Sequence, residues 1–124
     1  MLVHLKNRAL LRVSGPDAEV FLQGQLSNDI NKLNASSVQL NAYCQHQGKI
    51  LALFWVMKFE DSFFLSFPLD LRETIKPRLQ MFVIMSDVTI DDVTSSYLQI
   101  GLIDDEHQNS YAINDNLSFI TYAF

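Results

Sequence analysis

Cysteine is almost absent from the sequence, and this limits the classes of protein to which the chain can belong. Cys44 is the only cysteine, so no internal disulfide can form, which fits a reducing compartment such as the cytoplasm or an organelle matrix. The longest apolar run, residues 50–57, is far shorter than the roughly 20 residues of a membrane-spanning helix and lacks the flanks of a signal peptide. We therefore expect a soluble domain with no membrane partner.

Positive charge is scarce in the second part of the chain. Residues 1–50 carry five Lys or Arg against three Asp or Glu, a net +2, whereas residues 51–124 carry four against eleven, a net −7. No Lys or Arg follows residue 97, so a broad phosphate-binding surface is excluded there, and we expect no nucleic acid as a direct partner. The length of 124 residues and the 48% hydrophobic content predict one domain over residues 1–124.

The first part of the chain reads as a strand, a helix and two more strands. An apolar, branched run predicts a strand at residues 9–13. The following Ser-Gly-Pro sequence at 14–16 predicts the start of a helix, which an apolar stripe extends to about Ser27. Alternating polarity over residues 38–44 predicts a half-buried strand, and the mostly apolar residues 50–59 predict a central strand covered on both faces.

The remaining segments complete a mixed fold. A strand at residues 63–67 forms a hairpin with the central strand, and apolar residues at helical spacing predict a second helix at residues 71–82. Pro77 should kink that helix or make it restart near Lys76. Further strands are expected at residues 83–90, 97–103 and 117–124, with turns or loops at 91–92 and 104–110. This order predicts an α+β fold, a mainly antiparallel sheet with two helices on one face, close to the ferredoxin-like split unit.

Metal and nucleophilic chemistry are weakly supported. Cys44 and His46 should point to the same side of a strand, but zinc needs three or four ligands, and neither His4 nor His107 has a spacing that adds one. Cys44 lies in an apolar strand, where a thiol is normally buried and inert. We therefore predict no metal site and no catalytic residue.

A polar cluster at the end of the first helix leaves two interpretations open. Gln25, Asn28 and Asp29 interrupt an otherwise apolar helix, and Gly24 weakens it further. Their side chains can satisfy backbone groups at the helix terminus, or they can form a ligand site. Lys49, which leaves a turn, could meet the carboxylates of an anionic ligand beside this cluster.

Three segments of the chain carry a family resemblance: RVSGPDAEVFLQGQLSNDI at residues 12–30, LNAYCQHQGKI at 40–50 and ETIKPRLQMFVIMSDVTI at 73–90. Together they resemble the YgfZ family, the folate-binding relatives of the aminomethyltransferase T-protein of glycine cleavage. The resemblance covers about residues 8–103. It implies a ferredoxin-like half-unit of the folate-binding domain that YgfZ shares with GcvT, the T-protein.

The resemblance also implies a function. It makes tetrahydrofolate the expected cofactor and reduced folate the expected ligand, with Gln25, Asn28, Asp29, Tyr43 and Lys49 as folate-binding residues. It further implies a role in the maintenance of iron–sulfur cluster proteins and in transfer RNA modification, with iron–sulfur enzymes as partners.

Departures from the family pattern limit what the chain should do alone. Ala52 and Leu53 stand where T-proteins have an aspartate pair, and Pro68 stands where they have an asparagine. The family's Lys-Gly-Cys-Tyr-x-Gly-Gln-Glu segment has no counterpart, so the resemblance is to an N-terminal portion only. We expect a folate-binding module without catalysis in isolation. The alternatives are an aminomethyltransferase-like one-carbon transferase and a structural domain that self-associates through an edge strand near Phe124.

Overall fold

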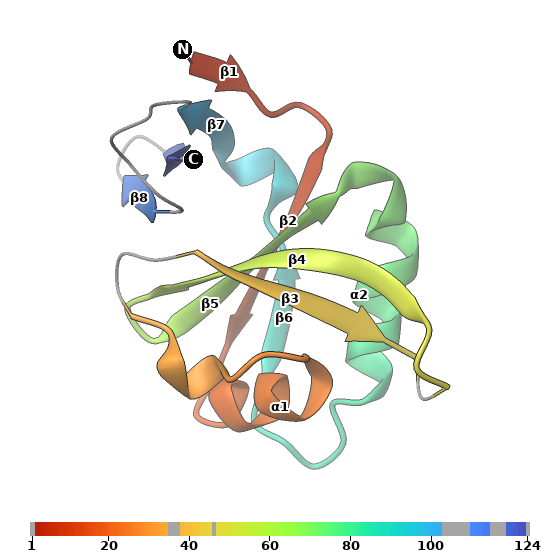
Figure 1. Cartoon of the computed structure of the whole chain (residues 1–124). Helices are drawn as coiled ribbons and strands as arrows, with labels where there is room; N and C mark the ends of the chain where they lie inside the picture. Colours follow the sequence, from red (N-terminus) through yellow and green to blue (C-terminus); the bar gives the residue numbers. More distant parts are fainter. Residues whose placement is uncertain (1, 35–37, 46, 103–109, 115–118, 124) are drawn as a thin grey trace.

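The computed structural model describes residues 2–34, 38–45, 47–102, 110–114 and 119–123, which form two sheets (Figure 1). The five-stranded sheet has the order β3-β4-β5-β2-β6, and its strands are β2 (Arg8–Ser14), β3 (Gln39–Cys44), β4 (Ile50–Phe59), β5 (Ser62–Pro68) and β6 (Thr89–Asp92). The four-stranded sheet has the order β1-β7-β9-β8, from β1 (Leu2–His4), β7 (Leu98–Leu102), β8 (Ser110–Asn114) and β9 (Phe119–Ala123). All strand pairs are antiparallel except β7 with β9. The expected α+β, mainly antiparallel fold is confirmed.

Two α-helices cover one face of the five-stranded sheet. They are α1 (Ala18–Gln25) and α2 (Arg72–Met81), and the single turns η1 (Ile30–Lys32), η2 (Leu69–Leu71) and η3 (Thr94–Ser96) supplement them. Phe21 and Leu22 of α1 pack in one cluster with Ile75 and Leu79 of α2 and with inward residues of β2, β4 and β5. On the other face, Leu10, Met57 and Phe64 pack against Ile120 and Tyr122 of the four-stranded sheet. The five-stranded sheet therefore lies between the helices and the second sheet.

Both helices differ slightly from the sequence prediction. Residues 14–17 precede α1 rather than belong to it, and Asp17 occupies its N-cap position. The helix α2 runs unbroken through Pro77, so the expected restart near Lys76 is not seen. No helix in the described part of the chain is long and apolar enough to cross a bilayer.

The strand predicted at residues 83–90 is wrong for most of its length. Strand β6 begins only at Thr89 and continues through Asp91 and Asp92, which were expected to form a turn. The preceding segment contains Met85 with φ 57°, which no strand accommodates, and it docks on the start of α1. There the backbone N–H of Asp87 donates to Asp17 Oδ2 at 2.7 Å. Tertiary contacts thus override the β-branched composition of this segment.

The second sheet was predicted only in part. Strands β7 and β9 lie within the predicted ranges 97–103 and 117–124, whereas β1 and β8 were not expected. Residues 103–109, 115–118 and 124 lie outside the described residues, and with them most of the predicted loop at 104–110. Because β1 has three residues, its sequence is too short to show a period.

Burial on β3 and β4 also differs from the prediction. Strand β3 is half-buried as expected, but Asn41 and Tyr43 point inward while Leu40 is 57% exposed. Strand β4 has its predicted bounds. Only its second half is covered on both faces, because Met57 is fully buried whereas Leu53 is 50% exposed.

A buried polar network joins the two sheets. The side-chain oxygen of Gln99 accepts hydrogen bonds from Ser66 Oγ at 2.9 Å and from the Tyr122 hydroxyl at 2.6 Å. Its amide nitrogen donates to the Arg8 carbonyl at 3.2 Å, and the Arg8 guanidinium donates to the Ser66 carbonyl at 2.8 Å. The guanidinium also lies 3.8 Å from the ring centroid of Trp55. The cation and the hydroxyls are thus satisfied between the sheets.

Unfolding at alkaline pH should report on this network. Burial raises the pKa of Tyr122 well above its ordinary value, and neither the hydrogen bond with Ser66 nor the charge of Arg8 offsets this. Above about pH 10 the unfolded chain loses a proton that the folded chain keeps, so each such tyrosine lowers stability by about 1.4 kcal/mol per pH unit. Below that pH the contribution is fully present. We expect the free energy of unfolding, measured with urea, to be level near pH 8 and to fall above about pH 10. Tyr122→Phe should make that fall shallower, and an unchanged slope would contradict the assignment.

Candidate functional site

The ends of three elements enclose a cavity of about 290 Å³ in the described part of the chain. These elements are the C-terminal turn of α1, the end of β3 and the last turn of α2, which converge in the lower half of Figure 1. The lining residues are Gly24, Gln25, Tyr43, Cys44, Arg78 and Phe82. Two of the five folate-binding residues predicted from sequence, Gln25 and Tyr43, thus meet in one cavity.

Tyr43 is held rigidly in this cavity. Strand β3 places it next to Leu26, with which it forms a β-bridge, and its ring stacks on Phe54 at 5.5 Å between centroids. The side chain is 2% exposed, yet its hydroxyl has no hydrogen-bond partner among the described residues. Burial raises the pKa of Tyr43, and the nearby Arg78, through its charge and its hydrogen-bonding approach to the hydroxyl, only partly opposes this. The hydroxyl therefore keeps its proton, for which no acceptor stands among the described residues.

Arg78 is the second unused donor. It lies in the last turn of α2, with its Cζ 6.0 Å from the ring centroid of Phe82. Its Nε is buried and, within the described part of the chain, lacks a hydrogen-bond partner. Arg78 was not expected to line a site, because an arginine on an amphipathic helix normally extends into solvent.

Asn28 and Asp29 fasten the loop beside the cavity. Asn28 Oδ1 accepts from the Asp29 backbone N–H at 2.9 Å, and Asn28 Nδ2 donates to the Leu40 carbonyl at 3.3 Å. Asp29 Oδ1 accepts from the Asn31 backbone N–H at 3.0 Å. The buried Asn41 completes the connection, since its Oδ1 accepts from the Asn28 backbone N–H at 2.8 Å. These bonds tie the end of α1 to the edge of β3 and so help to shape the cavity.

Lys49 and Cys44 occupy different surroundings. Lys49 is exposed in the turn after β3, where its carbonyl accepts from the Gln45 backbone N–H at 3.0 Å, and it does not line the cavity. Cys44 lines the cavity and is only partly buried, which corrects the prediction of a buried thiol. His46 lies outside the described residues. Among the described side chains, no three His, Cys, Asp or Glu come together as metal ligands.

The three positions at which the sequence departs from the T-protein pattern lie in different surroundings. Ala52 is buried beneath the helices, and Leu53 is half-exposed on the opposite face of β4. Pro68 ends β5. No polar side chain stands at any of the three positions, so they cannot position a ligand or stabilise a charge by hydrogen bonding.

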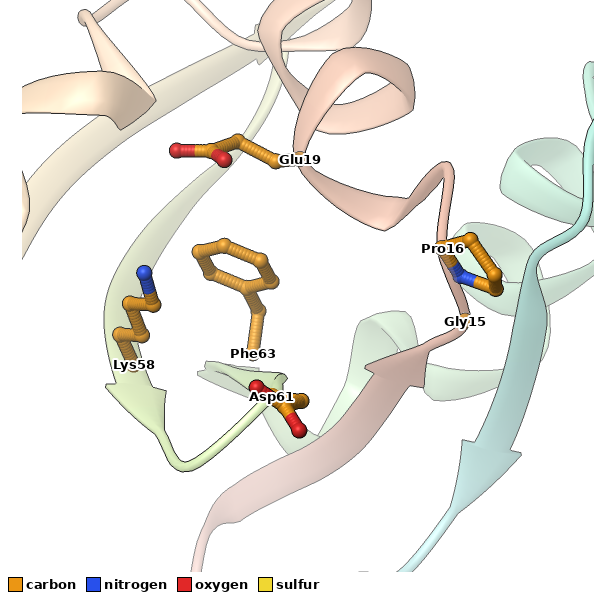
Figure 2. A pocket seen from close by; sticks show the side chains of 6 residues that line it. All are labelled: Gly15, Pro16, Glu19, Lys58, Asp61 and Phe63. Atoms are coloured by element: carbon orange, nitrogen blue, oxygen red, sulfur yellow. The ribbon is translucent and has the colours of Figure 1, made fainter.

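A second hollow, of about 420 Å³, lies between the start of α1 and the hairpin of β4 and β5 (Figure 2). Its lining residues are Gly15, Pro16, Glu19, Lys58, Asp61 and Phe63. Phe63 stands at its centre, with Lys58 Nζ 5.9 Å from the ring centroid, Glu19 above the ring and Pro16 on the side opposite Lys58 (Figure 2). The hollow mixes charges of both signs, and none of its described polar atoms is buried without a partner. The smaller cavity at Tyr43 is therefore the better candidate site.

Comparison with known proteins identifies relatives of part of the chain, although no family model matches it. The chain is 33% identical over 89 residues to a protein named tRNA-modifying protein YgfZ from Klebsiella pneumoniae, covering 72% of this chain and 27% of that protein. It is 32% identical over 96 residues to an aminomethyltransferase from Lysinibacillus sphaericus, covering 73% of this chain and 25% of that protein. The chain thus spans about a quarter to a third of the length of the curated relatives it matches.

A solved structure has the same fold. The crystal structure of glycine cleavage system aminomethyltransferase T from Bartonella henselae superposes with a TM-score of 0.66 at 18% sequence identity. The match covers 72% of this chain and 25% of the aminomethyltransferase. At this identity, the likeness concerns the fold of the matched part alone.

Proposed function

Because the chain belongs to the superfamily of YgfZ proteins and aminomethyltransferases, we propose that it is the tetrahydrofolate-binding module of a YgfZ-like protein. The share of its relatives that it matches fits an N-terminal portion of such a protein. On this proposal the cavity at Tyr43 forms part of the folate site, and the chain performs no chemistry on the folate by itself.

One observation carries the proposal. The three segments that resemble the YgfZ family lie far apart in the sequence, yet each contributes to the cavity: α1 supplies Gln25, β3 supplies Tyr43 and α2 supplies Arg78. A cavity in which a few convergent polar groups combine with aromatic walls is typical of a small-molecule site. The unpaired Tyr43 hydroxyl gives this site a donor that the fold itself does not use.

The wider role is part of the same proposal. Relatives carry the name tRNA-modifying protein, and we propose that the complete protein supports iron–sulfur enzymes, including one that modifies transfer RNA, in the cytoplasm. An aminomethyltransferase-like reaction is less well supported, because Ala52 and Leu53 offer no carboxylate. Self-association is the alternative in which no ligand is bound, but the predicted edge near Phe124 is not an edge, because β9 is paired with both β7 and β8. Mass measurements at low and high protein concentration test this alternative.

Lys49→Ala should weaken the binding of a reduced folate. In the proposed site Lys49 meets one of the two glutamate carboxylates of the ligand from an exposed turn, where a charge contact contributes up to about 1 kcal/mol. We therefore expect a two- to fivefold rise in Kd, roughly. The measurement is a titration of isotope-labelled protein with 5-formyltetrahydrofolate, monitored by the backbone amide signals.

The control is Lys6→Ala, which removes an exposed lysine from the turn between β1 and β2. In the unmodified protein, saturable shifts should cluster at residues 25–29 and 43–49. An equal Kd for both variants would remove Lys49 from the site. No saturable shift in the unmodified protein would refute folate binding by this chain.

A further inference from the structure

We propose that the cavity between Tyr43 and Arg78 is a carboxylate-binding subsite, in which the guanidinium and the tyrosine hydroxyl donate to one carboxylate. Both groups line the cavity of about 290 Å³, and both carry a buried donor without a partner among the described residues. A buried donor left unpaired destabilises the folded chain, whereas an acceptor supplied by a ligand removes this cost. An anion that binds here would therefore stabilise the folded chain.

Charge selects an anion over a cation or a neutral ligand. None of the six residues that line the cavity in the described part of the chain is acidic, and Arg78 is the only cation among them. The planar guanidinium matches the two oxygens of a carboxylate, and such pairs are among the strongest hydrogen-bonded contacts in proteins. A single cation suits a monoanion better than a doubly charged phosphate group, which favours a carboxylate.

Tyr43 adds a hydrogen-bond donor of fixed orientation beside the charge of Arg78. The bridge to Leu26 fixes its backbone, and its ring stacks on Phe54 in a position that is only 2% exposed, so the hydroxyl does not face solvent. The pKa of Tyr43, raised by burial, keeps the hydroxyl a donor at neutral pH. Gln25 adds an amide group, and Phe82 supplies an apolar wall at the exposed side of the cavity. A carboxylate attached to a flat apolar body thus fits these surroundings.

The subsite is independent of where the carboxylate comes from. It can take the glutamate tail of a folate or the carboxylate of a separate small acid. The simplest probe is sodium benzoate, titrated at constant ionic strength against sodium chloride, with the Nε–Hε signal of Arg78 followed by NMR. We expect a saturable shift of that signal together with the amide signals of Gln25 and Tyr43.

Variants separate the two donors. Arg78→Gln should abolish saturable binding, and Arg78→Lys should weaken it because lysine keeps the charge but loses the planar fork. Tyr43→Phe retains the aromatic stack and should raise Kd about tenfold, the effect expected for one hydrogen bond to a charged group. The matched control is Lys76→Gln, which removes a positive charge from the same helix at a residue that does not line the cavity. Lys76→Gln should bind benzoate as the unmodified protein does.

Two results would overturn the subsite: shifts that rise linearly with benzoate without saturation, or equal saturable binding by Arg78→Gln and Lys76→Gln.

A competition experiment then identifies which carboxylic acid the subsite holds. If 5-formyltetrahydrofolate and p-aminobenzoylglutamate displace benzoate, the subsite holds the folate tail. If benzoate binds saturably and neither compound displaces it, the subsite stands and serves another carboxylic acid. The folate proposal would then have to rest on shifts at residues that do not line the subsite, 26–29 and 45–49, so that the two proposals fail separately.

Discussion

Gln99→Leu is expected to lower the free energy of unfolding by about 3–5 kcal/mol. Gln99 is 3% exposed, and its side chain makes three hydrogen bonds that join β2, β5, β7 and β9. Leucine fills a similar volume but leaves the Tyr122 and Ser66 hydroxyls without their shared acceptor. Each buried unsatisfied group costs about 1–3 kcal/mol. The substitution should mainly weaken the packing of one sheet on the other.

Urea denaturation followed by circular dichroism measures this change. The matched control is Gln80→Leu, the same substitution at an exposed residue of α2, which should change stability by less than about 0.5 kcal/mol. Tyr122→Phe should offset part of the loss in Gln99→Leu, because it removes one of the hydroxyls that donated to Gln99. Equal stabilities for the two glutamine variants would show that the network contributes nothing.

Gly15→Ala is expected to cost about 3 kcal/mol or more, because strain and steric overlap act together. The glycine has φ +113°, a conformation that residues with a side chain rarely adopt. An added Cβ would lie 2.3 Å from the Asp87 carbonyl oxygen and 3.2 Å from Val88 Cα, both of which are backbone atoms. Room for the methyl group would therefore require the loop before β6 to leave the start of α1.

Substitutions at two other glycines separate the effect of backbone strain from the effect of steric overlap. Gly48 has φ +86° with no atom near an added Cβ, so Gly48→Ala measures conformational strain alone, at about 1 kcal/mol. Gly24 lies within α1 and is also open, so Gly24→Ala should raise stability by about 0.5–1 kcal/mol. The measured order of stability should be Gly24→Ala, then Gly48→Ala, then Gly15→Ala. A Gly15→Ala protein as stable as Gly48→Ala would show that the loop at Asp87 is not packed as described.

Much of the fold follows from local patterns. The apolar run of β4 is bounded by turn residues on both sides, so its limits at Ile50 and Phe59 could be read from the sequence. The segment at 83–88 could not, because its apolar, branched residues resemble a strand while contacts with Asp17 hold it in another conformation. The second sheet depends on short strands from both ends of the chain, and no local window contains that information.

The candidate site was predictable only in part, for a similar reason. Tyr43 and Gln25 could be selected on the family resemblance, and the structure places them in one cavity. Arg78 could not, because its burial depends on the approach of α1, β3 and α2. The polarity of β3 is also misleading: Asn41 is buried because it bonds the loop after α1, a contact that alternation alone does not reveal.

The pairing of the first strand with a late one has a consequence for folding order. All five strands of the helix-covered sheet are present once residue 92 has been synthesised, whereas Leu2 must wait for Leu102 and the second sheet also needs Phe119–Ala123. Closing so long a loop is slow, and no stabilising contact forms until both ends meet. We therefore expect the helix-covered sheet to form early during translation. The second sheet should pack onto it last, when Tyr122 joins the buried network around Arg8.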